Sequence, residues 1–387
     1  MPVKNRFAEL LPEITEWRHD LHENPEILFD TVRTAKVVEE KLKEFGCDEV
    51  VTGLGRTGLV GVIKGKSTAS GKVIGLRADM DALPILENTG VDYASKTPGA
   101  MHACGHDGHT AMLLGAAKYL AETRNFDGTV VVIFQPAEEG GGGGKEMCDD
   151  GMMERFGIQE VYGMHNWPGI PTGQFAIRPG GFFASTDQFE ITVRGQGGHA
   201  AQPNRTVDPI VTTATLVSAL QTIASRNADP IQQIVVSVCS VESSSKAFNV
   251  IPDAVTIRGT IRTMSKETRE LAETRLKAIA TSTCEAYGAK AEITWIKGYP
   301  AMVNSEEQTE FAAEVAREVA GNCDVAEITM GGEDFAYMLE ERPGAYILVG
   351  NGDTANVHTP EYNFNDDTIP AGCSWYSEIV EQRMPAA

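Results

Sequence analysis

The sequence predicts an α/β protein of two domains, in which the second domain is inserted into the first. Three observations predict this arrangement. The chain has 387 residues, which exceeds the size at which one hydrophobic core usually stops growing. Strand-like and helix-like segments alternate toward both ends of the chain, as in a sheet covered by helices. Between about Ser185 and Trp295 the order becomes strand, helix, strand, strand, helix, strand, which is the order of a ferredoxin-like domain.

Short apolar runs predict the strands, and longer runs with helical periodicity predict the helices. In the interrupted domain, strands are expected at 73–80, 129–136, 160–166 and 345–350, with an amphipathic segment at 8–20 and helices at 109–123, 305–320 and through Tyr376. In the inserted domain, strands are expected at 188–194, 233–241, 254–262 and 291–295, with helices at 208–226 and 266–287. The expected domains are therefore 1–184 with 296–387, and 185–295.

The composition excludes several classes of partner. Acidic residues outnumber basic ones 54 to 33, and the formal charge is −21, which repels nucleic acids and anionic membranes. No apolar run reaches the length of a membrane span, and no secretory apolar region follows the first residues, so we expect a cytoplasmic protein. The seven cysteines are scattered and odd in number, a pattern typical of reduced thiols and not of a disulfide framework.

One glycine-rich run matches a dinucleotide-binding motif by its spacing alone. The run Gly53-Leu-Gly-Arg-Thr-Gly58 matches the dinucleotide fingerprint, and Asp79 lies about twenty residues further on. That fingerprint requires a helix after its glycines, but the strand-like run 59–65 follows and leads through a Ser/Gly turn into another strand. We therefore predict a hairpin at this point and no dinucleotide.

The segment 101–109 reads Met-His-Ala-Cys-Gly-His-Asp-Gly-His and places Cys104 and His106 one residue apart. An extended turn can direct both side chains to one point, and thiolate and imidazole are good ligands for zinc-like metals. The alternative is a glycine-rich loop with supporting histidines. The density of these side chains favours a metal site.

Further polar residues stand where predicted strands end. Glu138 and Glu139 directly follow the strand at 129–136, and adjacent carboxylates there are costly unless they are paired or metal-bound. One could ligate a metal while the other activates water, and the glycines at 140–144 let the backbone approach closely. Three isolated histidines complete the set: His165 and His358 at strand ends, and His199 within the inserted domain. Side chains at the carboxyl ends of strands are typical of sites in open α/β sheets.

Seven motifs now support a specific resemblance. They are ADMDALP (78–84), MHACGHDGHT (101–110), FQPAEEG (134–140), GMHNWP (163–168), GGHAAQP (197–203), GGEDFAYM (331–338) and VHTPEYNFND (357–366). In this order they resemble the hippurate hydrolase and N-acyl-amino-acid amidohydrolase branch of the M20 metallopeptidase family. The resemblance implies a zinc-peptidase-like catalytic domain, an inserted ferredoxin-like lid and two divalent metal ions per chain. Zinc or manganese are the expected ions, with cobalt or nickel as alternatives.

The resemblance also implies roles for single residues. Glu138 would be the general base, Asp81 would orient a metal ligand, and His199 would stabilise the oxyanion. The chain departs from the wider family at Asp79, where a metal histidine is usual, and this leaves open which ligand holds which ion. The implied metal ligands are Cys104, His106, Glu139, His165 and His358.

Asn249 and Arg262 would contact the substrate carboxylate, with surface pairing inside the lid as the alternative. The resemblance thus implies an amidohydrolase that cleaves small-molecule N-acyl amino acids, with a homodimer contact through the lid. Two other enzymes stay open at this point. A metal-dependent dipeptidase or aminopeptidase would require a free substrate amino group, and a thiol hydrolase would use Cys104 as nucleophile and resist chelators.

Overall fold

The computed structural model describes residues 4–386. The chain divides into two compact units, one of which is interrupted by the other. The first comprises Met1–Gly180, Val303–Glu327 and Asp334–Ala387, and the second comprises Gly181–Met302 and Ile328–Glu333. The chain passes between the units near 180 and 302, compared with the expected 184 and 295. The segment Ile328–Glu333 was not expected in the second unit.

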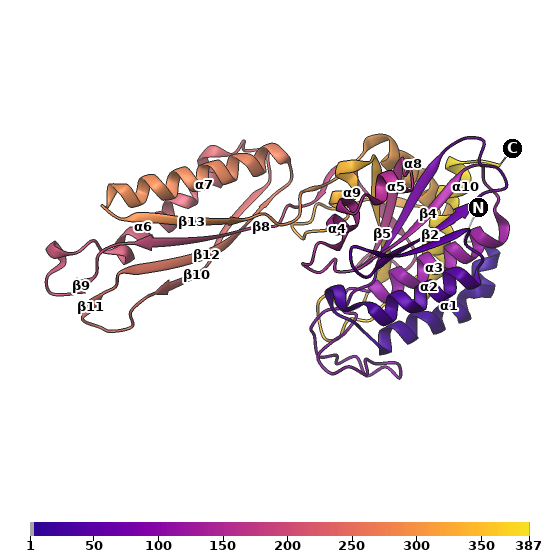
Figure 1. Cartoon of the computed structure of the whole chain (residues 1–387), viewed down its shortest axis with the longest axis horizontal. Helices are drawn as coiled ribbons and strands as arrows, with labels where there is room; N and C mark the ends of the chain where they lie inside the picture. The colour runs from indigo at the N-terminus through magenta and orange to yellow at the C-terminus, as the bar shows by residue number, and fades with distance from the viewer. Residues whose placement is uncertain (1–3, 387) are drawn as a thin grey trace. The chain divides into compact units, whose positions relative to one another are not determined.

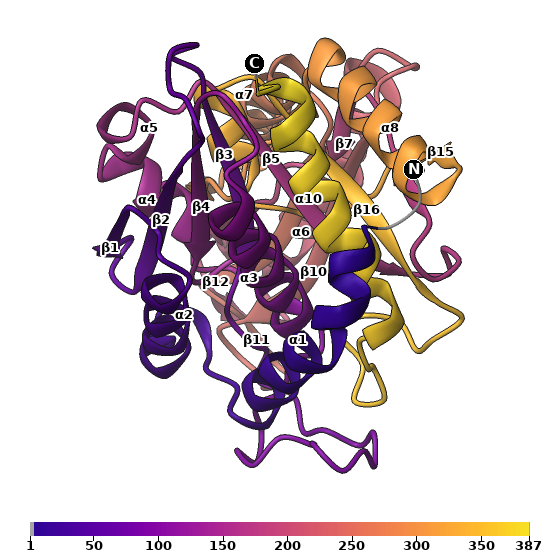
Figure 2. The same cartoon turned by 90° about the vertical axis from the view of Figure 1, so that its right-hand side faces the viewer.

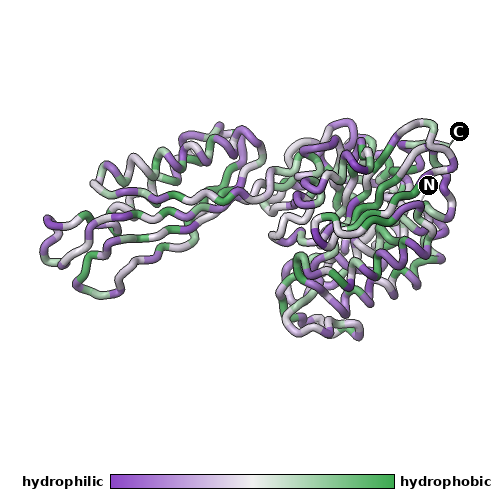
Figure 3. The backbone as a smooth tube through the Cα atoms, viewed as in Figure 1, coloured by the Kyte–Doolittle hydropathy of each residue, from purple (hydrophilic) through white to green (hydrophobic). Residues whose placement is uncertain are grey.

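The first unit is built on an eight-stranded mixed sheet with the order β1-β2-β4-β3-β5-β16-β6-β15. β3 runs parallel to β4 and β5, and β16 runs parallel to β5, so the carboxyl ends of these four strands share one edge. The central strands are mostly apolar, as their green colour in Figure 3 shows, and their residues are nearly all buried. The bounds are β1 Glu49–Leu54, β2 Gly58–Lys64, β3 Val73–Asp79, β4 Thr129–Gln135, β5 Glu160–Pro168, β6 Phe175–Ile177, β15 Cys323–Val325 and β16 Gly344–Gly352.

Helices cover this sheet, and α3 packs between α1 and α10 (Figures 1 and 2). Gly115 of α3 permits the close approach, because a Cβ there would lie 2.6 Å from Ile14 and 2.7 Å from Cys373. The short helices α4, α5 and α9 form a separate group. The bounds are α1 Asn5–Glu23, α2 Val32–Glu44, α3 His106–Thr123, α4 Gly143–Asp149, α5 Met152–Arg155, α8 Glu306–Ala320, α9 Ala336–Glu341 and α10 Ile369–Arg383.

The second unit contains a four-stranded antiparallel sheet, β10-β12-β8-β13, with α6 and α7 along one face (Figure 1). Alternate residues of β8 are buried, as expected for a sheet covered on one side only. Asp208 and Ser265 cap the two helices with their side chains. The bounds are β8 Asp187–Arg194, α6 Pro209–Leu220, β10 Ile234–Ser243, β12 Ala254–Thr263, α7 Lys266–Ala286 and β13 Lys290–Ile296.

Shorter elements complete the description. β7 (Gly180–Phe183) and β14 (Met302–Asn304) stand where the chain passes between units, and β9 (Gly198–His199) pairs with β11 (Val250–Ile251). Within residues 4–386, no helix combines the length and the apolar character that crossing a bilayer demands.

The structure corrects two expectations about single elements. The helix expected at 208–226 ends at Leu220 and is followed by a π-helical turn at Ile223–Asn227. The strand at 59–65 was expected to form a hairpin with the strand after it. It pairs instead with β1, and β4 separates it from β3. β2 and β3 are both buried nearly throughout, so an apolar neighbouring strand stabilises each of them. β4 lies between them and is that apolar neighbour for both.

Candidate metal centre

The five predicted metal ligands come from four places along the chain and meet in the first unit. Cys104 and His106 lie at the start of α3, Glu139 follows β4, His165 lies within β5, and His358 lies in the loop after β16. Their donor atoms form overlapping groups within 4.8 Å of one another. These groups are Cys104 with His106 and His165, Cys104 with Glu139 and His358, and His106 with Glu138 and Glu139.

Two contacts show how closely the donors approach. Sγ of Cys104 lies 3.3 Å from Nε2 of His165, and Nε2 of His358 lies 3.1 Å from Oε1 of Glu139. The Nδ1 of His165 donates to the carbonyl oxygen of Asn166 at 2.5 Å, so its Nε2 is the nitrogen that bears a lone pair toward Cys104.

His106 provides the test of whether this cluster fits a metal ion. Its side chain is 1% exposed, yet neither ring nitrogen makes a hydrogen bond, because the facing carboxylate oxygens of Asp81 and Asp79 lie 3.5 and 3.8 Å away. Leaving a buried polar atom unpaired costs roughly 1–3 kcal/mol, and a coordinated ion would remove that cost. The set of one thiolate, three imidazoles and one carboxylate matches the preference of zinc and similar transition metals. The residues therefore fit a metal centre.

Burial and neighbouring charges control the protonation of the thiol. Burial, followed by the carboxylates of Glu139 and Glu138, raises the pKa of Cys104 well above its usual range. A thiol must lose its proton to ligate a metal. Binding of an ion at Cys104 is therefore coupled to release of a proton.

The two buried imidazoles behave in opposite ways. Burial lowers the pKa of His106, but Asp79 and Asp81 outweigh burial and raise it to about 10. Burial lowers the pKa of His165 well below its usual value. His165 is thus neutral and ready to ligate at neutral pH, whereas His106 must first release a proton.

Asp81 holds the turn that carries the two glutamates. Its Oδ1 accepts the backbone N–H of Glu138 at 2.9 Å, and its Oδ2 accepts that of Glu139 at 3.1 Å. Ala137, just before them, has the left-handed φ of +53°, which is uncommon for a residue with a Cβ. Asp81 Oδ1 also lies 3.5 Å from Nδ1 of His106. One carboxylate therefore fixes the position of both glutamates and lies beside a predicted ligand.

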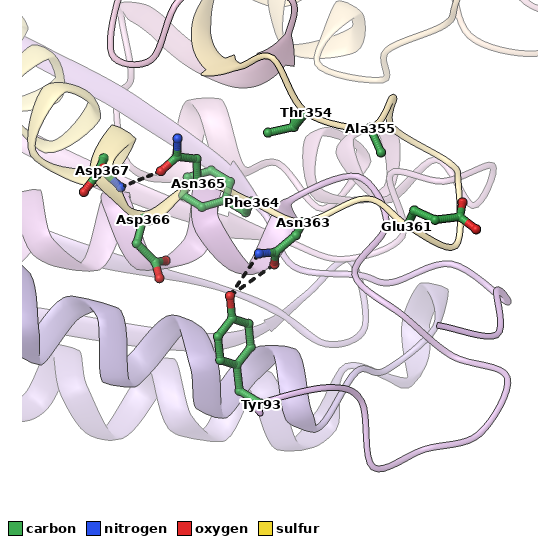
Figure 4. Close-up of a pocket in the computed structure, with 9 residues that line it drawn as sticks. All are labelled: Tyr93, Thr354, Ala355, Glu361, Asn363, Phe364, Asn365, Asp366 and Asp367. Atoms are coloured by element: carbon green, nitrogen blue, oxygen red, sulfur yellow. Dashed lines mark hydrogen bonds between the residues drawn. The ribbon is translucent and has the colours of Figure 1, made fainter. Parts of the chain in front are cut away.

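The loop that carries His358 is fixed at its base. The buried side chain of Asn351 donates to the carbonyl oxygen of Asn363 at 3.0 Å and accepts the N–H of Asn365 at 2.8 Å. On its outer side the loop borders a cavity of about 470 Å³, shown in Figure 4. There Nδ2 of Asn363 donates to the hydroxyl of Tyr93 at 3.0 Å. None of the predicted metal ligands lines this cavity.

Sequence reasoning missed a layer of buried polar residues beneath the donors. Arg77 contacts Asp79 at 2.7 Å and Asp334 at 3.0 Å, with all three side chains fully buried. The sequence signals were the unusual presence of charge inside an apolar strand and the places of Asp79 and Asp334 within two of the seven motifs. The other members of this layer are His109, Asn166 and Tyr362.

A second buried group joins α1 to the start of α3. Asp107, which follows His106, accepts from Arg18 at 3.2 Å and from His22 at 2.8 Å. Burial lowers the pKa of His22, but Asp107 outweighs it and raises that pKa to about 9. His22 is therefore protonated at neutral pH and forms a buried ion pair.

The remaining predicted residues lie in the second unit. His199 is exposed in β9 and pairs with Val250, and Ala200 N–H donates to the carbonyl oxygen of Asn249 at 3.0 Å. Arg262 lies in β12, eight residues beyond the first residue of that strand, which is roughly 25 Å at the usual strand rise. The structure brings His199 and Asn249 together. Arg262 lies near the carboxyl end of β12, whereas Asn249 precedes the start of that strand. Their roles stay predictions.

Comparison with known proteins yields consistent matches. The family model described as peptidase family M20/M25/M40 matches residues 75–382. Hippurate hydrolase of Campylobacter jejuni is 43% identical, over 97% of each chain. N-acetylcysteine deacetylase of Bacillus subtilis is 38% identical, over 94% of each chain. A crystal structure from Bacillus subtilis, described as a dinuclear metal binding peptidase of the M20 family, superimposes with a TM-score of 0.86 at 33% identity, over 97% of this chain and 99% of the other.

Proposed function

The chain belongs to peptidase family M20/M25/M40, and on that premise we propose that it hydrolyses the amide bond of N-acyl amino acids with two divalent metal ions. The observation that carries the proposal is the convergence of five metal donors and Glu138 in one largely buried cluster. The relatives named for hippurate and for N-acetylcysteine support this substrate class. The reaction converts the amide and one water into a carboxylic acid and a free amino acid.

The proposed ligands are Cys104, His106, Glu139, His165 and His358. When bound, the two ions would supply Lewis acidity and lower the pKa of water. Zinc or manganese are the proposed ions. The relative described as dinuclear supports the number two, and the buried, unpartnered nitrogens of His106 support its place among the ligands.

Glu138 is the proposed general base. Its side chain is buried within the donor cluster, and Asp81 fixes its backbone. Its carboxylate would take a proton from the attacking water and pass it to the leaving nitrogen, so that the amine departs neutral. The adjacent Glu139 is engaged by His358, which supports the division of tasks between the two carboxylates.

We propose three further residues for binding and stabilising the substrate. His199 would donate to the oxyanion that forms at the scissile carbonyl, and Asn249 and Arg262 would contact the substrate carboxylate. A homodimer contact through the second unit is part of the same proposal. A cytoplasmic location is also proposed, because the seven cysteines are scattered along the sequence and odd in number.

A substrate panel tests the proposal. Protein stripped of metal by a chelator is reloaded with Zn²⁺, Mn²⁺, Co²⁺ or Ni²⁺ and offered N-benzoyl, N-acetyl and indole-acetyl amino acids, beside the matching free dipeptides. We expect hydrolysis of the acylated compounds, loss of activity on stripping and its return on reloading. Cleavage restricted to substrates with a free amino group would assign a dipeptidase or aminopeptidase instead. Full activity in stripped protein would exclude the metal mechanism.

A further inference from the structure

Asp79 and His109 form a fully buried pair beneath the donor cluster. The Nδ1 of His109 lies 2.6 Å from Oδ1 of Asp79, and Nη1 of Arg77 donates to Oδ2 of Asp79 at 2.7 Å. A carboxylate flanked by these partners is an acceptor, so Nδ1 of His109 must carry the hydrogen. Both oxygens of Asp79 are therefore engaged by protein donors.

The other nitrogen of His109 is equally engaged. Its Nε2 accepts the backbone N–H of Asn166 at 2.9 Å and lies 2.9 Å from the side-chain Nδ2 of the same residue. A backbone N–H can only donate, so Nε2 carries no hydrogen and the ring is neutral. The tautomer of His109 is thus fixed from both sides.

Asn166 links this ring to two predicted ligands. It follows His165 in β5, and its Nδ2 also donates to the carbonyl oxygen of Cys104 at 2.7 Å. Its Oδ1 accepts from the hydroxyl of Tyr362 at 2.5 Å. The side-chain amide of Asn166 therefore holds the backbone of Cys104, and His109 contacts both nitrogens of Asn166, the residue that adjoins His165.

We infer that His109 is a positioning residue of the metal centre. Its ring, oriented by Asp79, clamps Asn166 and so fixes the distance between Cys104 and His165. Asp79 accordingly serves as the support of this clamp and not as a metal ligand. The inference rests on the proposed function, because it assigns the clamp a purpose only if Cys104 and His165 bind a metal.

The competing assignment is a metal ion held by Asp79, His106 and His109, whose donor atoms lie within 4.8 Å of one another. The hydrogen bonds above count against it. Both oxygens of Asp79 and both nitrogens of His109 already have protein partners, and only the two nitrogens of His106 are open. Such an ion would have to break a buried ion pair and a buried hydrogen bond, each of which is costly to break.

Two amide substitutions at one position separate the clamp from general stability. In His109→Gln, the longer side chain can place its oxygen near the position of Nε2 and accept from Asn166. In His109→Asn, the shorter side chain can reach Asp79 but leaves Asn166 without its acceptor. Both variants replace the imidazole by a neutral amide. Thr110→Val, which removes only the hydrogen bond from Thr110 to the carbonyl oxygen of Asp79, is the control for lost buried polar contacts.

The readout is binding of Co²⁺ to the full-length, metal-free protein, followed by the thiolate-to-cobalt charge-transfer absorption that ligation by Cys104 would produce. We expect His109→Asn to bind Co²⁺ about 10–100-fold more weakly, the usual range for a lost outer-shell partner, with a reduced or shifted band. His109→Gln and Thr110→Val should keep the wild-type band. Rescue by Gln but not by Asn is the result that a merely structural role would not produce.

Equal behaviour of the Gln and Asn variants, with the wild-type band in both, would overturn the inference. If His109→Asn does not fold, Asn166→Ser serves instead, since it removes the amide that contacts Cys104, and a wild-type band in that variant would overturn the inference. A wild-type protein that binds Co²⁺ without a thiolate band would overturn the proposed ligand set. The failure of the clamp and the failure of the metal site are therefore distinguishable.

Discussion

The backbone N–H of His358 donates a hydrogen bond of 2.7 Å to the carbonyl oxygen of Ala103. Ala103 precedes Cys104, so this bond joins the loop that carries the last proposed metal ligand of the chain to the loop that carries the first. His358 adopts the left-handed φ of +64° to make it, a conformation that costs a residue with a Cβ about 1–2 kcal/mol. Contacts in the surrounding loops offset this strain. The hydrogen bond to Ala103 therefore fixes the position of the His358 backbone.

Replacement of Glu138 and Glu139 by Gln, one at a time, tests their separate tasks. Glu138→Gln keeps the size of the side chain but removes its basic oxygen, so metal content should stay near wild type. We expect kcat to fall by at least ~10²–10⁴-fold, with little change in substrate affinity. Glu139→Gln should lower metal occupancy, and excess metal should partly restore its activity. Metal content and steady-state kinetics are measured for both variants. If Glu138→Gln loses metal while Glu139→Gln keeps it and loses only kcat, the two roles are exchanged.

Asp81→Asn tests the support of the same turn. The substitution turns one acceptor oxygen into a donor that faces a backbone N–H, so one of the two bonds to Glu138 and Glu139 must be lost. A misplaced base and a misplaced ligand should both follow. We expect a loss of kcat together with weaker metal binding, about 10–100-fold for the metal. If the folded variant keeps the wild-type kcat and the wild-type metal affinity, the turn keeps its conformation without the help of Asp81.

Two glycines with the same φ of +85°, Gly105 and Gly99, form a matched pair. A Cβ at Gly105 would lie 2.2 Å from Nδ2 of Asn166 and 2.5 Å from the hydroxyl of Tyr362, whereas nothing lies within 4 Å of one at Gly99. Gly99→Ala should cost about 1–2 kcal/mol in backbone strain alone. Gly105→Ala should cost a further ~1–3 kcal/mol from overpacking and weaken metal binding as well. Equal losses in denaturant titrations would mean that the loop relaxes around the methyl group.

The ion pair between His22 and Asp107 predicts a dependence of stability on pH. The pKa of His22 is raised from 6.5 to about 9 in the folded protein. Its contribution is therefore complete below pH 6.5 and is lost as the pH rises through about 9. The loss should be on the order of 3 kcal/mol, from 1.36 kcal/mol per pH unit.

The variant His22→Gln should lack this part of the pH dependence, as measured by the free energy of unfolding between pH 6 and 10. His19→Gln is the control, because His19 lies on the same helix and also contacts an aspartate, Asp366, but at a more exposed site. Parallel pH curves for wild type and His22→Gln would contradict a protonated His22 at neutral pH.

The strands, and the meeting of most of the proposed ligands, could be predicted from the sequence because their signals are local. The run Thr-Val-Val-Val-Ile-Phe at 129–134 is apolar enough to require burial, and polar residues directly after such a run must lie at the edge of the sheet. The convergence of Cys104, Glu139 and His358 follows from that rule together with the parallel order of the strands.

The pairing of strands could not be predicted, because apolar periodicity says that a strand is buried but not which strands lie beside it. For this reason the placement of β4 between β2 and β3 was missed. The clamp of His109 on Asn166 depends on the register between α3 and β5, which leaves no local mark in the sequence. The separation of Asn249 from Arg262 likewise follows from the direction of β12.

The position of β16 has a consequence for how the chain folds while it is translated on the ribosome. β16 lies between β5 and β6 in the sheet, yet roughly 180 residues are translated between β5 and β16, which takes roughly ten to thirty-five seconds at about 5–20 residues per second. During that interval Cys104, His106, Glu139 and His165 have left the ribosome, while β5 still has an unpaired edge open to aggregation. His358 emerges only after the sheet can close. We therefore expect the nascent chain to need a chaperone over this interval, and insertion of the metal to be a post-translational step.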